Sequence, residues 1–170
     1  ADVSNSGNIE VHGLYYGTGI AASSYYGSTV TNTGGSIYVY ALGGATGIDA
    51  QSPFGDVTVV NASDITAVGL YYGAIGINAN SVYGDTHVTN SGDIYAASIY
   101  GAATGVYALG EGSSVDNSGS ITAVVQGDVA RATGVINAAS YTGDAITTNS
   151  GDINAIAQGG VAPYGVYEAQ

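Results

Sequence analysis

Cysteine, methionine, tryptophan and lysine are all missing from this 170-residue chain. Without cysteine, the chain forms no disulfide, offers no thiolate to a metal and has no cysteine nucleophile. The one basic residue is Arg131, against 13 acidic residues, so the formal net charge is −12. Because nucleic acids and anionic membranes are bound mainly through Lys and Arg, this composition argues against both as partners.

Long hydrophobic runs are also missing. No stretch approaches the roughly 18 apolar residues of a membrane-spanning helix, and no signal-peptide pattern stands at the N-terminus, so we expect no membrane span. Hydrophobic residues still make up 45% of the chain, which is enough to form a core, and 28 glycines occur without the period of collagen. This abundance of glycine predicts many tight turns.

Two short phrases recur along the whole sequence. The first is a Val-x-Asn or Thr-x-Asn strand phrase followed by a turn and Ile, and its asparagines are Asn5, Asn32, Asn61, Asn90, Asn117 and Asn149. The second is Gly-Ile or Gly-Val, at Gly19, Gly47, Gly76, Gly105, Gly134 and Gly165. The first marker recurs every 27 to 32 residues and the second every 28 to 31. Two markers with one period indicate six structural repeats.

Within each repeat the apolar residues alternate with polar ones, as in Ile65-Thr-Ala67 and Ile94-Tyr-Ala96. This period of two is typical of strands, and no uninterrupted helical stripe competes with it. Three strands and three turns per repeat predict an all-β, parallel β-helix of about six coils that spans residues 1–170 as a single block. With about 4.8 Å per coil, the rod is about 29 Å long. A propeller blade would need a longer repeat with four strands.

Stacked coils place equivalent residues in columns. The six asparagines are expected to form a structural ladder, in which each amide bonds to the next, because buried amides need such partners. The glycines two residues later, at positions 7, 34, 92, 119 and 151, are expected to adopt positive φ in the turn, with Ser63 replacing glycine once.

Acidic residues also fall into columns, and two interpretations of them stay open. Asp64 and Asp93 share one turn position, and Asp56 and Asp85 share another. Asp commonly caps turns through its own side chain. Carboxylates stacked one coil apart also repel, which favours a bridging cation and makes weak Ca²⁺ binding the alternative. We expect no other cofactor.

Aromatic residues are the strongest candidates for binding. Fifteen of the 16 are tyrosines, and many precede glycine in turns or loops. The candidate binding residues are Tyr15, Tyr16, Tyr25, Tyr26, Tyr71, Tyr72, Tyr83 and Tyr100. Such rings can stack on sugars or dock onto proteins. Alternatively, Tyr26, Phe54 and Tyr83 form a column whose rings simply stack on one another.

Catalysis has weaker support. Two neighbouring aspartate columns offer the carboxylate spacing of a glycosidase, so a carbohydrate-active β-helix enzyme is the alternative function. The candidate bases, Arg131, His12 and His87, each stand alone in their columns, and no nucleophile triad, metal-ligand spacing or phosphate loop appears. Because the acids repeat with the scaffold, we expect that the protein is not an enzyme.

The repeats resemble the passenger β-helices of bacterial autotransporters and related surface adhesins. The segments that carry the resemblance are GDVTVVN, VTNSGDI, TGVYA and YGVYEA. The resemblance covers residues 1–170 and implies a right-handed β-helix that is secreted or held at the bacterial cell surface. It also implies a role in adhesion or biofilm formation. The chain lacks the signal peptide, C-terminal barrel and cap of a full family member, so we expect a window of, or a subunit in, a longer rod.

The resulting hypothesis is a non-enzymatic, extracellular β-helix rod that acts as an adhesin stalk or as a self-assembling fibre element. Its expected partners are host or bacterial surface glycans or proteins, bound through the tyrosine-rich loops and the outward columns. Copies of the chain are expected partners as well, because the end coils of a β-helix present unpaired backbone groups that favour head-to-tail stacking.

Overall fold

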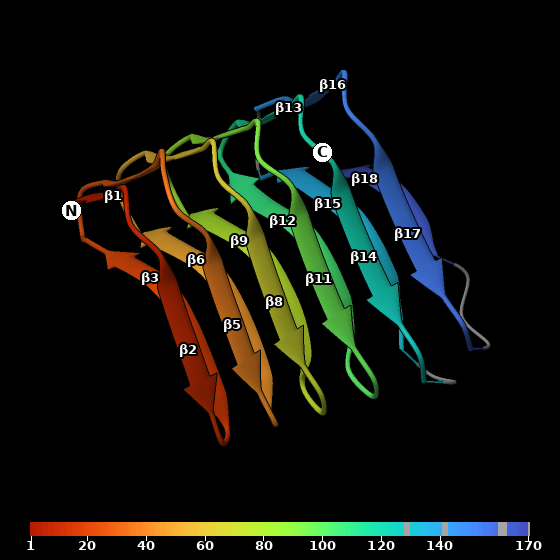
Figure 1. The fold of residues 1–170 in the computed structure, drawn as a ribbon. Helices are drawn as coiled ribbons and strands as arrows, with labels where there is room; N and C mark the ends of the chain where they lie inside the picture. Colours follow the sequence, from red (N-terminus) through yellow and green to blue (C-terminus); the bar gives the residue numbers. More distant parts are fainter. Residues whose placement is uncertain (128–129, 141–142, 160–162, 170) are drawn as a thin grey trace.

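A computed structural model describes residues 1–127, 130–140, 143–159 and 163–169. In this part of the chain, eighteen strands and no helix form three parallel sheets that wind around one axis (Figure 1). The all-β solenoid that the repeat predicts is therefore confirmed.

Each sheet takes one strand from every repeat, in sequence order. Sheet A contains β1 (Asp2–Asn5), β4 (Ser28–Asn32), β7 (Val57–Asn61), β10 (Thr86–Asn90), β13 (Ser113–Asn117) and β16 (Ala145–Asn149). Sheet B contains β2 (Ile9–Gly13), β5 (Ile37–Ala41), β8 (Ile65–Gly69), β11 (Ile94–Ser98), β14 (Ile121–Val125) and β17 (Ile153–Ala157). Sheet C contains β3 (Tyr16–Ser23), β6 (Gly44–Ser52), β9 (Gly73–Ser81), β12 (Ala103–Gly110), β15 (Ala132–Ala139) and β18 (Tyr164–Ala169).

The register between coils follows the sequence repeat residue by residue. In sheet A, for example, Val59 pairs with Val30 on one side and Val88 on the other. Six strands per sheet are joined by five coil-to-coil steps, so the solenoid makes about five turns, slightly fewer than the six coils counted from the repeats. The difference arises because a turn is completed only when the chain returns to the same sheet.

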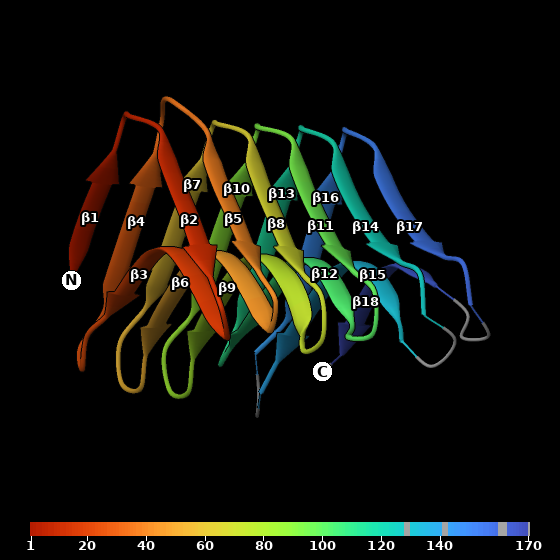
Figure 2. The ribbon, with the colours of Figure 1, turned by 60° about the horizontal axis from the view of Figure 1, so that its bottom comes forward.

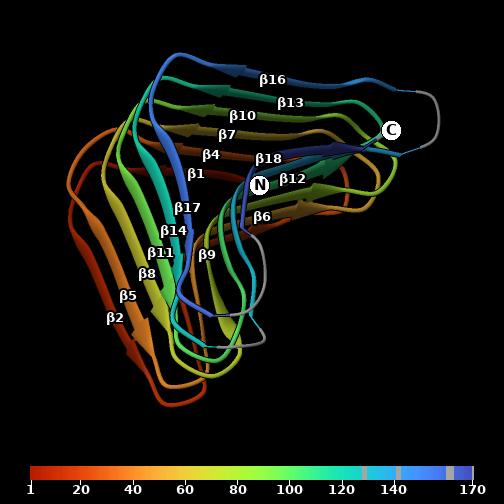
Figure 3. The same ribbon diagram turned by 90° about the vertical axis from the view of Figure 1, so that its right-hand side faces the viewer.

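The path of one coil is clear in Figure 2, where the chain passes up through sheet A, turns, descends through sheet B and then enters sheet C. Seen along the axis from the C-terminal side, each coil runs counterclockwise as the chain advances towards the viewer (Figure 3). The solenoid is therefore right-handed. Its outline is L-shaped, because the strands of sheet C bend and face sheet B first and sheet A afterwards (Figure 3).

The core consists of short apolar columns. Sheets A, B and C contribute fully buried Val59, Ile65 and Ile77, together with their equivalents in neighbouring coils. Small residues such as Ala67 and Ala79 alternate with these branched side chains, which leaves a narrow interior. One position departs from the pattern: buried Asn137 stands in the column of Ala108 and donates to Ile146 O at 2.8 Å.

The bend in sheet C depends on the second repeat phrase. A Cβ added to Gly76 would lie 2.3 Å from Ile94 Cγ2 and 2.5 Å from the carbonyl oxygen of Gly105. The pairing between β6 and β9 runs through the residues on either side of this glycine and omits it. Glycine is therefore required here because sheet C passes so close to the isoleucines of sheet B.

The expectation of positive φ for the turn glycines is wrong. Among the described residues, positive φ occurs at Gly27, Gly35 and Gly73, none of which belongs to that column. From the second coil onwards the column glycines allow close approach instead, because a Cβ on Gly92 would lie 2.2 Å from Ser63 O of the preceding coil, whereas one on Gly7 in the first coil would meet no atom within 4 Å. The tight coil spacing, and not the backbone conformation, selects glycine there.

Candidate functional site

Two corners of the solenoid collect most of the exposed aromatic residues. The first, which we call the BC corner, is the set of turns from sheet B to sheet C at residues 14–15, 42–43, 70–72 and 99–102, together with Tyr16 at the start of β3. The second, the CA corner, is the set of turns from sheet C to sheet A at residues 24–27, 53–56 and 82–85. All eight candidate tyrosines lie in or at the edge of these corners, with exposed fractions between 54% and 80%.

The BC corner contains a notch. In the second coil, Gly44 pairs with Tyr16 of the first coil and with Gly73 of the third, so Gly43 and Gly44 align with Tyr15-Tyr16 on one side and with Tyr72-Gly73 on the other. The rings of Tyr16 and Tyr72 approach each other over this gap, with centroids 5.7 Å apart and planes at 23°. A cavity of about 270 Å³ remains beside them. It is lined by Leu14, Tyr15, Leu42, Gly43, Tyr71 and Tyr72.

The next rings extend this aromatic surface along the axis. Tyr71 and Tyr100, from adjacent coils, are stacked with centroids 5.3 Å apart and planes at 12°. Offset stacks of this kind hold rings in fixed orientations while one face stays open to solvent. The BC corner is therefore a preformed surface of tyrosine rings and leucine side chains, without a charged group among the residues that line the notch.

In the CA corner the rings form a continuous row. Phe54 lies between Tyr25, at 4.6 Å, and Tyr83, at 5.3 Å. Tyr26 contacts only the edge of Tyr25 among these rings, at 4.8 Å and 82°. The predicted stacking column is thus present, but Tyr25 takes the position assigned to Tyr26. Ring stacking and the binding of an external partner are compatible for these tyrosines, because the stacked rings also remain exposed.

Positive-φ glycines explain two of the tyrosine pairs. Gly27, at φ 141°, follows Tyr25 and Tyr26, and Gly73, at φ 113°, follows Tyr71 and Tyr72. A residue with a side chain rarely adopts these values, so the chain uses glycine to reverse direction directly after the aromatic pair. The rings are thereby placed at the outermost point of the turn.

The asparagine ladder is present along the full length of the solenoid. The Nδ2 group of each asparagine donates to Oδ1 of the asparagine in the next coil, at 2.7–2.8 Å. In most coils the same Nδ2 also donates to a carbonyl oxygen two residues later, as Asn90 does to Gly92 O at 2.8 Å. These amides bind the scaffold and are not available to a ligand.

The four aspartates considered for calcium also bind the scaffold. Asp56 Oδ1 accepts from the backbone N–H of Asp85 at 3.0 Å, and Asp64 Oδ1 accepts from that of Asp93 at 3.2 Å. Asp85 and Asp93 repeat this contact with Gly112 and Ser120, at 2.9 and 3.0 Å.

Each of these carboxylates thus fastens its turn to the following coil. Within the described residues, no three His, Asp or Glu side chains form a group able to hold a metal ion. Calcium binding stays a prediction, because water and backbone carbonyls also serve as ligands.

Both histidines make contacts on the outer surface. His87 joins the hydroxyls of Ser114 and Thr89, which stand in adjacent coils of sheet A. His12 lies 2.8 Å from Glu10 on the same strand. The Ser114–His87 pair was not found from the sequence, because it links residues 27 positions apart. The other ring nitrogen of His87 contacts the hydroxyl of Thr89 and not a carboxylate, so this grouping is not a Ser-His-Asp triad.

The apolar column on the outer face of sheet B was not predicted from the sequence. Its outward positions carry apolar residues in successive coils, including Val68, Ala97 and Val124. The signal was present in the segments ITAVG and ITAVV, where apolar residues occupy both faces of the strand. A search for alternation registers only the buried face, so this second stripe went unrecognised.

No family model, curated protein or solved structure matches this chain. The described part of the chain contains no helix that is long and apolar enough to cross a membrane.

Proposed function

We propose that this protein is a non-enzymatic structural rod of the bacterial cell surface or extracellular space that binds surface glycans through its aromatic corners. The observation that carries the proposal is the collection of all eight candidate tyrosines at two corners of an otherwise uniform solenoid. The rest of the proposal, including secretion and a role in adhesion, rests on the resemblance of the repeats to autotransporter passengers.

The chemistry of the BC corner favours a neutral sugar. Tyrosine rings offer flat apolar faces that pack against the C–H groups of a sugar ring, and their hydroxyls offer hydrogen bonds at the rim. The cavity beside Gly43 has room for about one sugar ring, and a net charge of −12 repels anionic ligands. Binding sites repeated along a rod also give avidity towards a polymer.

Affinity electrophoresis through gels that contain galactomannan, xyloglucan or mixed-linkage β-glucan tests this proposal. We expect at least one of these neutral polysaccharides to retard the protein. The triple variant Tyr15→Ala/Tyr71→Ala/Tyr72→Ala should bind at least about tenfold more weakly, since each lost stacking contact contributes on the order of 1 kcal/mol.

The matched control is Thr29→Ala/Thr58→Ala/Thr89→Ala, which removes three side chains from the outer face of sheet A and should leave the retardation unchanged. Equal loss in both triple variants, or no retardation on any of the three polysaccharides, would contradict glycan binding at the BC corner. Release of reducing ends during the same incubation would favour the enzyme alternative instead.

The ladder also supports assembly along the axis. Each asparagine donates towards the C-terminal side and accepts from the N-terminal side. A further coil placed in register after Asn149 therefore meets a donor, and the amide of Asn5 presents the matching acceptor on the first coil. We infer that copies of the rod stack head to tail through this continued ladder, with the same polarity throughout.

A further inference from the structure

We propose that the outer face of sheet B is a self-complementary surface through which two copies of this protein pack side by side. This inference goes beyond the proposed glycan binding, which uses the BC corner, and beyond axial stacking, which uses the end coils. It rests on the residue pattern of the face, its lack of charge, its surface shape and its area.

The outward side chains of sheet B form two columns. One column, nearer the AB turn, contains Glu10, Tyr38, Thr66, Tyr95, Thr122 and Asn154. The other contains His12, Tyr40, Val68, Ala97, Val124 and Ile156. This second column is aliphatic at every position from the third coil onwards, and the second coil contributes the ring of Tyr40. Where the strands end, the apolar surface continues into the edge of the BC corner through Leu42, Leu70 and Ile99.

Charge decides which partner fits this face. The six strands of sheet B contain one carboxylate, Glu10, which lies beside His12 in the first coil. Among the described residues, the remaining acidic residues belong to turns or to the other two sheets, where a basic partner would be attracted. A second copy carries the same charge of −12 and is repelled from those surfaces. The outer face of sheet B is where two copies approach with the least repulsion.

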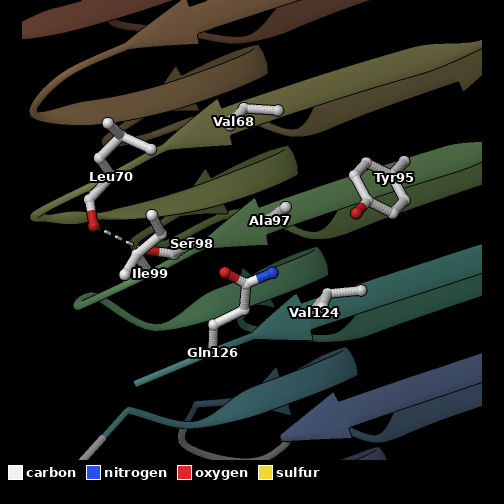
Figure 4. Close-up of a pocket in the computed structure, with 8 residues that line it drawn as sticks. All are labelled: Val68, Leu70, Tyr95, Ala97, Ser98, Ile99, Val124 and Gln126. Atoms are coloured by element: carbon white, nitrogen blue, oxygen red, sulfur yellow. Dashed lines mark hydrogen bonds between the residues drawn. The ribbon is translucent and has the colours of Figure 1, made fainter. Parts of the chain in front are cut away.

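The shape of the face is complementary to itself about a two-fold axis. A hollow of about 240 Å³ lies over Ala97, between Tyr95 and the side chains of Leu70 and Ile99, with Val68 and Val124 in the neighbouring coils (Figure 4). The ring of Tyr95 projects beside this hollow and is 42% exposed. Because projection and hollow are neighbours, a two-fold axis between them places each Tyr95 ring over Ala97 of the other copy.

The area of the face predicts a weak dimer. Six strands about 4.8 Å apart and five residues long cover roughly 450 Å² per copy, or about 900 Å² in total. Stable interfaces usually bury at least about 1,200 Å², so this one belongs with weak, transient contacts. In such a dimer the two copies of sheet B pack face to face, about 10 Å apart, as in other sheet-on-sheet packings.

Sedimentation velocity of the 170-residue protein from about 10 µM to about 1 mM tests the proposal. The measurement is made in an Asn149→Asp background, which weakens axial stacking. There we expect a monomer–dimer equilibrium that shifts towards the dimer as NaCl is raised, because salt screens the repulsion between acidic copies and strengthens apolar burial. In the same background, the variant Ala97→Glu should stay monomeric throughout.

The matched control is Thr58→Glu, which adds the same charge to the outer face of sheet A and should still dimerise. Far-UV circular dichroism reports whether each variant keeps the solenoid, and Val124→Glu replaces Ala97→Glu if the latter fails to fold. An Asn149→Asp protein that stays monomeric at 1 mM overturns the proposal. Dimers that weaken with added salt, or that Thr58→Glu disrupts equally, place the contact elsewhere and also overturn it.

Discussion

Single residues in this solenoid act through their copies in the coils above and below. Asn90 is fully buried, accepts from Asn61 and donates to Asn117, with all its amide groups satisfied by the ladder and the adjacent turn. An isolated buried amide would be costly, whereas a column of them is self-consistent. The same reasoning explains why the sequence repeats asparagine at this position without exception.

Removing one amide from the middle of the ladder should therefore affect two neighbours. In Asn90→Ala, the Nδ2 of Asn61 and the Oδ1 of Asn117 each lose their ladder bond to this residue, and we expect the free energy of unfolding to fall by about 2–4 kcal/mol. Urea unfolding followed by circular dichroism measures it. The control is Asn5→Ala in the partly exposed first coil, which has a ladder neighbour on one side and should cost about 1 kcal/mol. Equal losses in the two variants would contradict a cooperative ladder.

At the scale of the strand, sheet C differs from the other two sheets. Its strands reach nine residues, as in β6 and β9, whereas the longest strands of sheets A and B have five. The extra length allows each strand to face sheet B with its first half and sheet A with its second half (Figure 3). Glycine at the bend is what permits the close packing against the isoleucine column of sheet B.

A methyl group at that bend should be destabilising only where another coil covers it. In Gly76→Ala the new Cβ meets Ile94 and the backbone of Gly105, so we expect a loss of about 2–3 kcal/mol from overpacking. Gly165 stands in the same column, but no atom lies within 4 Å of its added Cβ, so Gly165→Ala should change stability by less than about 0.5 kcal/mol. Thermal unfolding of both variants checks this. Similar melting temperatures for the two would show that packing at the bend does not select glycine.

At the scale of the whole molecule, the distribution of charged and apolar side chains defines three kinds of surface that can contact a partner. The BC and CA corners present aromatic rings, the outer face of sheet B is nearly uncharged, and the end coils present the ladder. Apart from Glu10, the acidic side chains of the described residues are spread over the turns and the other two sheets, where several of them accept hydrogen bonds from the following coil. Repulsion between these surfaces favours a few specific contacts over general aggregation.

Head-to-tail stacking of the solenoid should produce rods that are visible by electron microscopy. We expect negatively stained micrographs of the 170-residue protein at high concentration and high salt to show thin rods that are longer than one solenoid. In Asn149→Asp, the last ladder position still accepts from Asn117 but no longer donates, so rod length should decrease while the solenoid stays folded. Compact particles alone, in the wild type at every salt concentration, would contradict head-to-tail assembly.

Much of the fold followed from the period alone. The spacing of Asn61 and Asn90 predicted the ladder, and the phrase Tyr-Tyr-Gly predicted the exposed turns, because every coil repeats the same local choices. The ring partners did not follow in the same way. Tyr16 stacks with Tyr72, two coils away, because two glycines leave a gap between them.

Thus the repeated alternation of apolar and polar residues was sufficient to specify three parallel sheets, their register and the buried columns, since each coil can bury its apolar face only against an identical neighbour. The roles of the turn glycines, the notch in the BC corner and the apolar outer face of sheet B emerged only when the coils were stacked. These features depend on distances between residues about 29 or 58 positions apart, and the order of residues along the chain does not contain those distances.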